Sequence, residues 1–227
     1  MPINHPRGAI VTLDGPAGAG KSTLAKKLAQ RLNLLYLESG AFYRAVALEA
    51  HRRSGELLSS EWLTTFLADF ELQVSPGSQG LKLAVNGRDI TAAIREPAVS
   101  EGASLVATLR PVRQWVLARL RQLAAPGRVI AEGRDMGTRV FPEAEVKIFL
   151  EADLKVRARR RWLELQAQGK TIHLDTVYHD MALRDQRDRE RREDPLQVPE
   201  GAYRLDNTGY DPEQVVEICI TVIEPYL

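Results

Sequence analysis

The chain has 227 residues, of which 44% are hydrophobic, enough for one α/β domain or for a core with one inserted piece. Its 31 basic and 30 acidic residues leave a net charge of +1, which excludes a global attraction to nucleic acid or to an anionic membrane. The lone cysteine, Cys219, cannot form an intramolecular disulfide, and no apolar run approaches the roughly 20 residues that span a bilayer, so we expect a cytoplasmic protein without nucleic-acid or membrane partners.

A buried strand, a glycine-rich loop and an amphipathic helix are predicted at the start of the chain. Residues 9–13 are apolar and largely β-branched and stop at Asp14, as expected of a strand buried on both faces of a parallel sheet. Leucines recur at positions 24, 28 and 32, which predicts a helix over 21–31 with one apolar face.

The loop between them fits the pattern G-x-x-x-x-G-K-[ST], and its residues are Gly15, Pro16, Ala17, Gly18, Ala19, Gly20, Lys21 and Ser22. Such a loop turns its backbone N–H groups towards phosphate oxygens, and the following helix adds its positive N-terminal end. We expect Lys21 at the β- and γ-phosphates of ATP and the Ser22 hydroxyl at Mg²⁺. The alternative is a glycine-rich turn with a surface lysine, but the flanking strand and helix favour phosphate binding.

Strands and helices alternate along much of the remaining chain. Strands are predicted at 34–37, 128–131, 146–150 and 202–205, and helices at 43–52, 111–123 and 212–223. This alternation predicts a doubly wound parallel sheet of the α/β class. An acid that binds the metal through water is expected at the carboxyl end of a strand. Glu132 and Asp14 are the candidates, and the alternative for each is a turn cap.

Two segments interrupt the alternation. Residues 71–75 and 81–85 alternate apolar with polar side chains, Asn86-Gly87 offers a tight hairpin turn, and a helix is predicted at 97–108, so we expect an inserted lobe at about 62–109. The other segment is 153–195, where ten basic against six acidic residues between 157 and 192 leave a charge of +4.

Two arginines follow strands that end beside the phosphate loop. Arg44 comes after the second predicted strand and Arg134 after the third, so both are expected at the same edge of the sheet. Two guanidinium groups there could bind a second phosphate bidentately, which an ATPase does not need. Each arginine by itself is more often a surface ion pair, and the pair beside a phosphate loop indicates an acceptor site.

Five sequence blocks closely resemble the bacterial cytidylate kinase family of nucleoside monophosphate kinases, over essentially the whole chain. The blocks are DGPAGAGKST (14–23), ESGAFYR (38–44), EGRDMGTRVFP (132–142), VKIFL (146–150) and RDQRDRER (184–191). The resemblance implies transfer of a phosphoryl group from ATP to CMP or dCMP with Mg²⁺ as cofactor. It also implies a three-layer P-loop core with a five-stranded parallel sheet over 1–61 and 110–227, a small inserted monophosphate-binding domain at 62–109 and a helical lid at about 153–195. Arg139 is an extra basic residue relative to the family pattern.

Residue by residue, the resemblance implies the following site. The acceptor would be bound by Ser39, Arg44, Ser104, Arg113, Arg134, Asp135, Arg184, Asp188 and Arg191, with Arg134, Arg184 and Arg191 acting in catalysis beside Lys21. ATP would also contact Thr23 and the lid arginines Arg157 and Arg161. A carboxylate such as Asp135 can accept from the exocyclic amine of cytosine while Arg113 donates to the ring, so UMP should be a poor acceptor.

The charged residues of the block 184–191 have a helical spacing. Arg184, Arg187, Asp188 and Arg191 fall at i, i+3, i+4 and i+7, so a helix would present all four on one stripe. The alternative is a solvated helix face crossed by salt bridges.

Two other functions compete with this interpretation. One is a P-loop kinase for a different small acceptor, which an acceptor screen would identify. The other is a nucleic-acid-binding module with a vestigial phosphate loop, which would show strongly salt-dependent binding and which the near-zero net charge disfavours. We expect a monomer.

Overall fold

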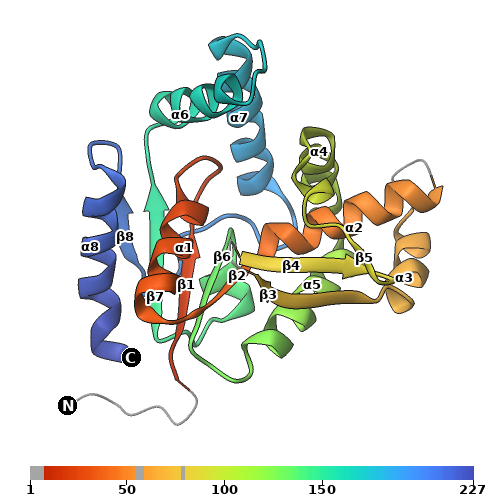
Figure 1. The fold of residues 1–227 in the computed structure, drawn as a ribbon, viewed down its shortest axis with the longest axis horizontal. Helices are drawn as coiled ribbons and strands as arrows, with labels where there is room; N and C mark the ends of the chain where they lie inside the picture. The colour runs from red at the N-terminus through yellow and green to blue at the C-terminus, as the bar shows by residue number, and fades with distance from the viewer. Residues whose placement is uncertain (1–7, 55–58, 78–79) are drawn as a thin grey trace.

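The apolar runs predicted as strands pair into one parallel sheet with the order β2-β6-β1-β7-β8 (Figure 1). The structure, a computed structural model, describes residues 8–54, 59–77 and 80–227. In that part of the chain the sheet has five strands, β1 (Ile10–Asp14), β2 (Leu35–Glu38), β6 (Val129–Gly133), β7 (Val146–Glu151) and β8 (Tyr203–Asp206). The predicted five-stranded parallel sheet is therefore confirmed, and each strand boundary lies within two residues of its predicted position.

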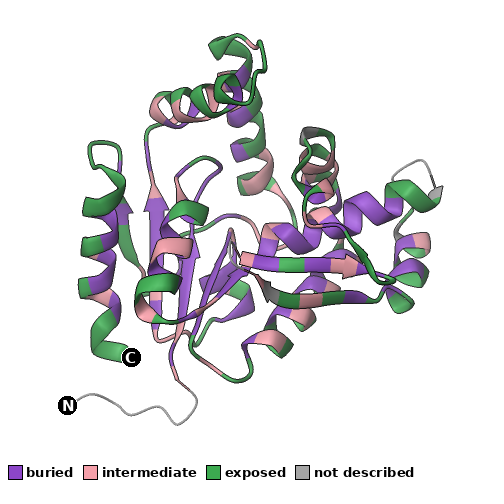
Figure 2. Cartoon of the chain, viewed as in Figure 1, coloured by how far each residue is buried: buried purple, intermediate pink, exposed green. Residues whose placement is uncertain are grey.

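Helices cover both faces of this sheet, because successive strand side chains point to opposite sides. Val11 and Leu13 of β1 pack against one pair of helices, whereas Val129 and Ala131 of β6 pack against another. The first pair is α1 (Lys21–Leu32) and α8 (Pro212–Ile223), and the second is α2 (Ser39–Ser54) and α5 (Arg110–Ala124). Figure 2 shows the buried strands between these half-buried helices, so the three-layer core is confirmed.

The register of the central strands brings two loops together. Asp14 at the end of β1 lies opposite Gly133 on β6, so both strands end at the same level. The phosphate loop that follows β1 and the chain that follows β6 therefore leave the sheet side by side. A short π-helical turn, η2 (Met136–Val140), follows β6.

The inserted segment forms a three-stranded antiparallel sheet with helices around it. Its elements are α3 (Ser60–Ala68), β3 (Leu72–Gly77), β4 (Gly80–Val85), β5 (Arg88–Asp89), the 3₁₀ turn η1 (Ala93–Arg95) and α4 (Pro97–Val106). The predicted turn at Asn86-Gly87 joins β4 to β5, with φ of 51° and 74°. Leu83 and Phe66 share one core with Phe42 of α2. The insert thus packs directly on the main body, and its delimitation at 62–109 stays a prediction.

Two helices, α6 (Leu154–Ala167) and α7 (Leu174–Glu190), stand above the carboxyl ends of the strands in Figure 1. Asp153 caps α6 by accepting hydrogen bonds from the N–H groups of Lys155 and Val156, at 2.8 and 3.4 Å. The predicted four-residue stripe is wrong in one respect, because α7 ends at Glu190 and Arg191 is extended, with φ −59° and ψ 140°.

The C-terminal α8 is closed by a short 3₁₀ turn, η3 (Glu224–Tyr226). Within the described ranges, each helix is too short or too polar to serve as a membrane span.

Candidate active site

The phosphate loop leaves β1 at a position that requires glycine. Gly15 has φ +147°, and a Cβ atom there would overlap with the carbonyl oxygen of Leu150 on β7. Helix α1 then begins at Lys21 with Gly20 as its N-cap, so no side chain caps the first turn. The free N–H groups of this first turn and the positive end of the helix dipole are suited to binding an anion at the carboxyl edge of the sheet.

Lys21 is buried in this site, and among the described residues it forms no ion pair within 4 Å. Its Nζ donates a hydrogen bond to the carbonyl oxygen of Pro16 at 2.7 Å. Burial lowers the pKa of Lys21 to about 7, and the neighbouring charge of Arg134 adds to the effect. A phosphate group at the loop would supply the missing negative charge.

A hydroxyl and a carboxylate meet beside Lys21. Ser22 Oγ donates to Glu132 Oε1 at 2.6 Å, and the Tyr36 hydroxyl donates to the same oxygen at 2.9 Å. Glu132 Oε2 is buried and has no hydrogen-bond partner among the described residues. Burial, with Glu38 close by, raises the pKa of Glu132. This oxygen-rich pair is suited to a hard cation that carries part of its own water shell.

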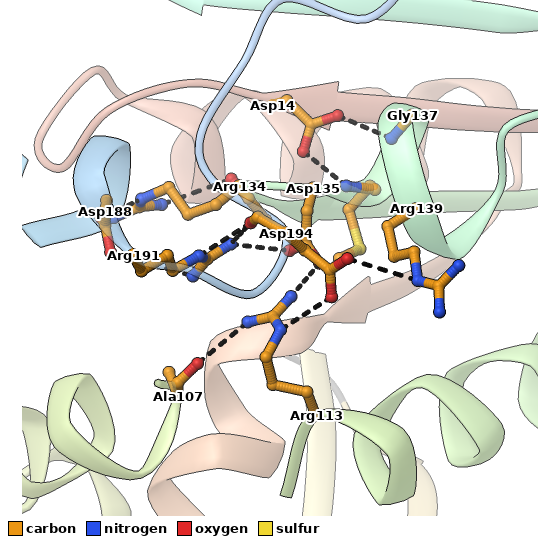
Figure 3. A network of polar contacts seen from close by, with 12 residues as sticks. Asp14, Ala107, Arg113, Arg134, Asp135, Gly137, Arg139, Asp188, Arg191 and Asp194 are labelled. Carbon is orange, nitrogen blue, oxygen red and sulfur yellow. Dashed lines mark hydrogen bonds and ion pairs between the residues drawn. The ribbon is translucent and has the colours of Figure 1, made fainter. Parts of the chain in front are cut away.

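Asp14, the other candidate for the acid at the metal, binds backbone N–H groups instead. Its two carboxylate oxygens accept hydrogen bonds from the N–H groups of Met136 and Gly137, both at 2.8 Å (Figure 3). Burial raises the pKa of Asp14 to about 7 in spite of these bonds. Asp14 therefore ties the end of β1 to the loop after β6, and Glu132 is the acid at Ser22.

A cavity of about 1330 Å³ extends from the phosphate loop to the lid and the insert, well above the roughly 300–1,000 Å³ of a site for one drug-sized ligand. Most of the predicted site residues line it: Ala17, Gly18, Gly20, Lys21, Ser22, Thr23, Ser39, Arg44, Ser104, Glu132, Arg134, Asp135, Arg161, Arg184, Asp188 and Arg191. Gly15, Pro16, Ala19, Arg113 and Arg157 are not among its lining residues. The cavity thus joins the two predicted halves of the site.

Arginines dominate the half of the cavity away from the phosphate loop. Arg44 pairs with Glu38, but its buried Nε has no hydrogen-bond partner in the described chain. Arg134 Nε donates to Asp188 Oδ2 at 2.8 Å. Burial would raise the pKa of Asp188, but the charge and hydrogen bond of Arg134 outweigh it and lower that pKa. These guanidinium groups and the exposed Arg184 line the cavity with donors that are suited to an anion.

A network of charged groups closes this half (Figure 3). Arg113 Nη2 binds Asp135, its Nη1 donates to the carbonyl oxygen of Ala107 at 3.0 Å, and its Nε donates to Asp194 Oδ2 at 2.8 Å. Arg191 Nη2 lies 3.5 Å from the second oxygen of Asp135. Burial raises the pKa of Asp135, although Arg113 and Arg191 oppose the shift. Asp135 therefore faces the cavity as a carboxylate fixed by two arginines.

Serines from two helices complete the acceptor half. Arg187 Nη1 donates to Ser104 Oγ at 3.3 Å, which joins α7 to α4. Ser39 is buried at the start of α2, and a Cβ atom at Gly133 would meet its Oγ at 2.7 Å. Both serines thus lie where the insert, α2 and the lid approach the end of β6.

Arg157, predicted to contact ATP, lies behind the phosphate loop in this structure. Its guanidinium is buried, with Nη1 at 2.9 Å from the carbonyl oxygen of Ala17 and 2.7 Å from Asp185 Oδ2, while Nε donates to the carbonyl oxygen of Ala152 at 2.8 Å. Asp185 Oδ1 accepts from the N–H of Ala17 at 3.2 Å. These groups satisfy the guanidinium, so in this structure Arg157 supports the phosphate loop from behind. Its expected contact with ATP stays a prediction.

Two neighbouring arginines of α6 do reach the cavity. Arg161 lines it and pairs with Glu164 at 3.0 Å on the helix surface. Arg160 also lines it and donates to Oδ1 and to the carbonyl oxygen of Asn207, at 2.9 and 3.1 Å. The Asn207 amide in turn donates to the carbonyl oxygen of Ala19 at 2.7 Å.

Sequence reasoning missed Tyr36, Arg160, Asp185 and Asp194. Asp185 could have been found, because it continues an apolar stripe formed by Val177 and Met181 at intervals of four residues, and an acid on such a face needs a buried partner. Asp194 follows the helix in an irregular loop, so no periodicity marks it.

A glycine-rich anion site, an oxygen-rich pair beside it and an arginine-lined second anion site share one cavity. This arrangement, on a doubly wound parallel sheet, defines a P-loop phosphotransferase that brings two anionic substrates together. The family model described as Cytidylate kinase matches residues 11–225. The chain belongs to the cytidylate kinase family.

Individual relatives agree with this assignment. The chain is 41% identical to the cytidylate kinase of Carboxydothermus hydrogenoformans, over 94% of this chain and 96% of the relative. It is 42% identical to that of Geobacter sulfurreducens, over 96% and 93%. It is also 44% identical to a bifunctional pantoate ligase/cytidylate kinase of Synechococcus elongatus, but covers only 42% of that longer protein.

Proposed function

We propose that the chain transfers the γ-phosphoryl group of ATP to CMP or dCMP, giving ADP and CDP or dCDP. The main support for this proposal is the position of Asp135. This buried carboxylate is held by two arginines, and it lines the same cavity as the phosphate loop. The relatives named cytidylate kinases support it.

Asp135 accounts for the choice of base. Its carboxylate would accept hydrogen bonds from the exocyclic amine of cytosine, and Arg113, in contact with Asp135, would donate to the ring acceptors. Ser104 would supply a further polar contact. Uracil presents an oxygen in place of the amine, so its lone pairs would face the carboxylate, at a cost of roughly 1–3 kcal/mol.

We expect Mg²⁺ to bind together with ATP, and the residues at the phosphate loop fit it. Ser22 and the unpartnered oxygen of Glu132 offer oxygen ligands, with Glu132 acting through water. Among the described residues no three His, Cys, Asp or Glu side chains cluster as a metal site, so the other ligands would come from phosphate and water. The bound ion would neutralise charge on the β- and γ-phosphates.

The transfer step would depend on position and charge. Lys21 would hold the β- and γ-phosphates, while Arg44 and Arg134 would hold the acceptor phosphate in line with them. Arg184 and Arg191 would stabilise the phosphoryl group in transit, and Asp188 would orient Arg134. No general base is required, because a phosphate monoester is largely ionised near pH 7. A closed lid, with Arg161 over ATP, would exclude water as a competing acceptor.

An acceptor screen tests the proposal. ADP formation is measured with CMP, dCMP, UMP, AMP and shikimate as acceptors, each over a range of concentrations. We expect kcat/KM for CMP or dCMP to exceed that for UMP by about tenfold to a hundredfold. A preference for UMP, AMP or shikimate would contradict the proposed acceptor.

We further infer that the enzyme acts as a monomer in the cytoplasm, where ATP and nucleoside monophosphates are available. Most of the ligands proposed for both substrates line one cavity of this chain. Sedimentation velocity across a range of protein concentrations tests the monomer, and a concentration-dependent dimer would contradict it.

A further inference from the structure

Asp194 connects three arginines that come from separate parts of the chain. Its Oδ2 accepts from Arg113 Nε at 2.8 Å, its Oδ1 lies 3.3 Å from Arg139 Nε, and its backbone carbonyl oxygen accepts from Arg191 Nε at 2.7 Å. Figure 3 shows Asp194 between these three side chains. It is not among the residues that line the cavity.

The backbone at this position is specific as well. Asp194 has φ +46°, a conformation that aspartate and asparagine tolerate better than most residues. The loop is closed by a hydrogen bond from the N–H of Leu196 to the carbonyl oxygen of Asp188, at 2.8 Å. The carboxylate and the carbonyl of Asp194 are therefore presented to different arginines by one short, fixed loop.

Arg113 is the member of this network on which base recognition depends. Its Nε, Nη1 and Nη2 are each held by a different acceptor, from Asp194, Ala107 and Asp135. Its side chain is only 4% exposed, so water cannot replace a lost partner at little cost. Arg113 thus forms ion pairs with both Asp194 and Asp135, and the bond to Asp194 fixes the plane of its guanidinium group.

We propose that Asp194 is a positioning residue that determines acceptor specificity: it holds Arg113, and through it Asp135, in the orientation that selects cytosine over uracil. This inference rests on the proposed base-reading role of Arg113 and Asp135. It assigns part of the specificity to a residue outside the substrate cavity.

The test uses Asp194→Asn, because asparagine keeps the size of the side chain and tolerates the positive φ. We expect KM for CMP to rise about tenfold, since a charge-assisted hydrogen bond becomes a neutral one, while KM for UMP, KM for ATP and kcat stay within about twofold. The ratio of kcat/KM for CMP to that for UMP therefore falls about tenfold. Asp194→Gly removes the whole carboxylate without a φ penalty and serves as the second variant.

Arg139→Ala is the matched control. Arg139 contacts the same carboxylate from the solvent side, with 58% of its side chain exposed, so its loss should change these constants by no more than about twofold. Thermal unfolding of every variant separates loss of fold from loss of positioning.

Arg113→Met distinguishes the inference from the function on which it rests. If Arg113→Met raises KM for CMP and both Asp194 variants leave it unchanged, the role of Asp194 is refuted and the base-reading role stands. If Arg113→Met itself leaves the preference for CMP over UMP unchanged, the proposed base recognition fails, and the inference with it. Equal increases in KM for CMP, UMP and ATP in Asp194→Asn would indicate a general structural role and would also refute the proposal. In the double variant Arg113→Met with Asp194→Asn, an effect on KM for CMP smaller than the sum of the two single effects would support the proposal.

Discussion

The buried ion pair behind the phosphate loop leads to a quantitative prediction. Asp185 and Arg157 lie 2.7 Å apart with 4% of each side chain exposed, and between them they bind both the N–H and the carbonyl oxygen of Ala17. In Asp185→Asn the guanidinium would lose its counter-ion while it stays buried. Removal of one partner from a buried pair typically costs about 3–5 kcal/mol, and the remaining amide dipole places the expected loss near the lower limit, at about 3 kcal/mol.

Glu151→Gln provides the comparison, because it makes the same acid-to-amide change. Glu151 also lies 2.7 Å from its arginine, but 62% of the Arg204 side chain is exposed, so we expect a loss of at most about 1 kcal/mol. The free energy of unfolding is measured by urea titration with the fluorescence of the three tryptophans. For a chain of this size the expected difference in Tm between Asp185→Asn and wild type is about 6–12 °C.

Two results would refute this reasoning. Equal losses in Asp185→Asn and Glu151→Gln would mean that burial does not strengthen the pair. A double variant Asp185→Asn with Arg157→Met that is destabilised by the full sum of the single effects would mean that the two side chains are not coupled. We expect the double variant to be less destabilised than that sum, because it no longer contains an unpaired buried charge.

Three further predictions concern single residues at the site. Lys21→Ala should lower kcat by at least about a hundredfold with an unchanged Tm, because in the proposed mechanism the lysine would contact charge that develops on the phosphates; near-normal turnover would remove it from the mechanism. Tyr36→Phe should raise the Mg²⁺ concentration needed for half-maximal rate about tenfold, since its hydroxyl orients Glu132, whereas the exposed Tyr203→Phe should not. The pKa of Asp14 is raised from 3.8 to about 7, so its contribution to stability is complete below pH 3.8 and is lost as pH rises to about 7. The stability advantage of wild type over Asp14→Asn, measured by urea titration, should therefore shrink between about pH 4 and 7, and a constant difference would contradict this.

Local patterns were sufficient to predict the strand, loop and helix around Lys21 and Ser22. The phosphate loop was predicted because a strand, a glycine motif and a helix are contiguous in the sequence, and the structure places Lys21 and Ser22 accordingly. The meeting of Ser22 with Glu132, 110 residues later, followed from the rule that parallel strands end at one edge.

Partners separated in the sequence do not follow from local patterns: Arg113 and Asp135 were expected together only through the family resemblance, and Asp194 was not expected at all. Arg113 comes from α5, Asp135 from the loop after β6 and Asp194 from the loop after α7, and only the packed fold brings them together. The direction of Arg157 depended on how the lid lies on the phosphate loop, which places this arginine behind Ala17 and leaves Arg160 and Arg161 at the cavity.

Helix α7 contacts both loops of the site. Met181 and Asp185 lie against the phosphate loop at Gly18 and Ala17, and Asp188, one turn further on, binds Arg134. A rigid helix cannot tilt at one end without moving the other, so under the proposed function a nucleotide bound at either loop would change the helix position that the second nucleotide encounters. By thermodynamic linkage, whatever factor ATP imposes on the affinity for CMP is the factor that CMP imposes on the affinity for ATP.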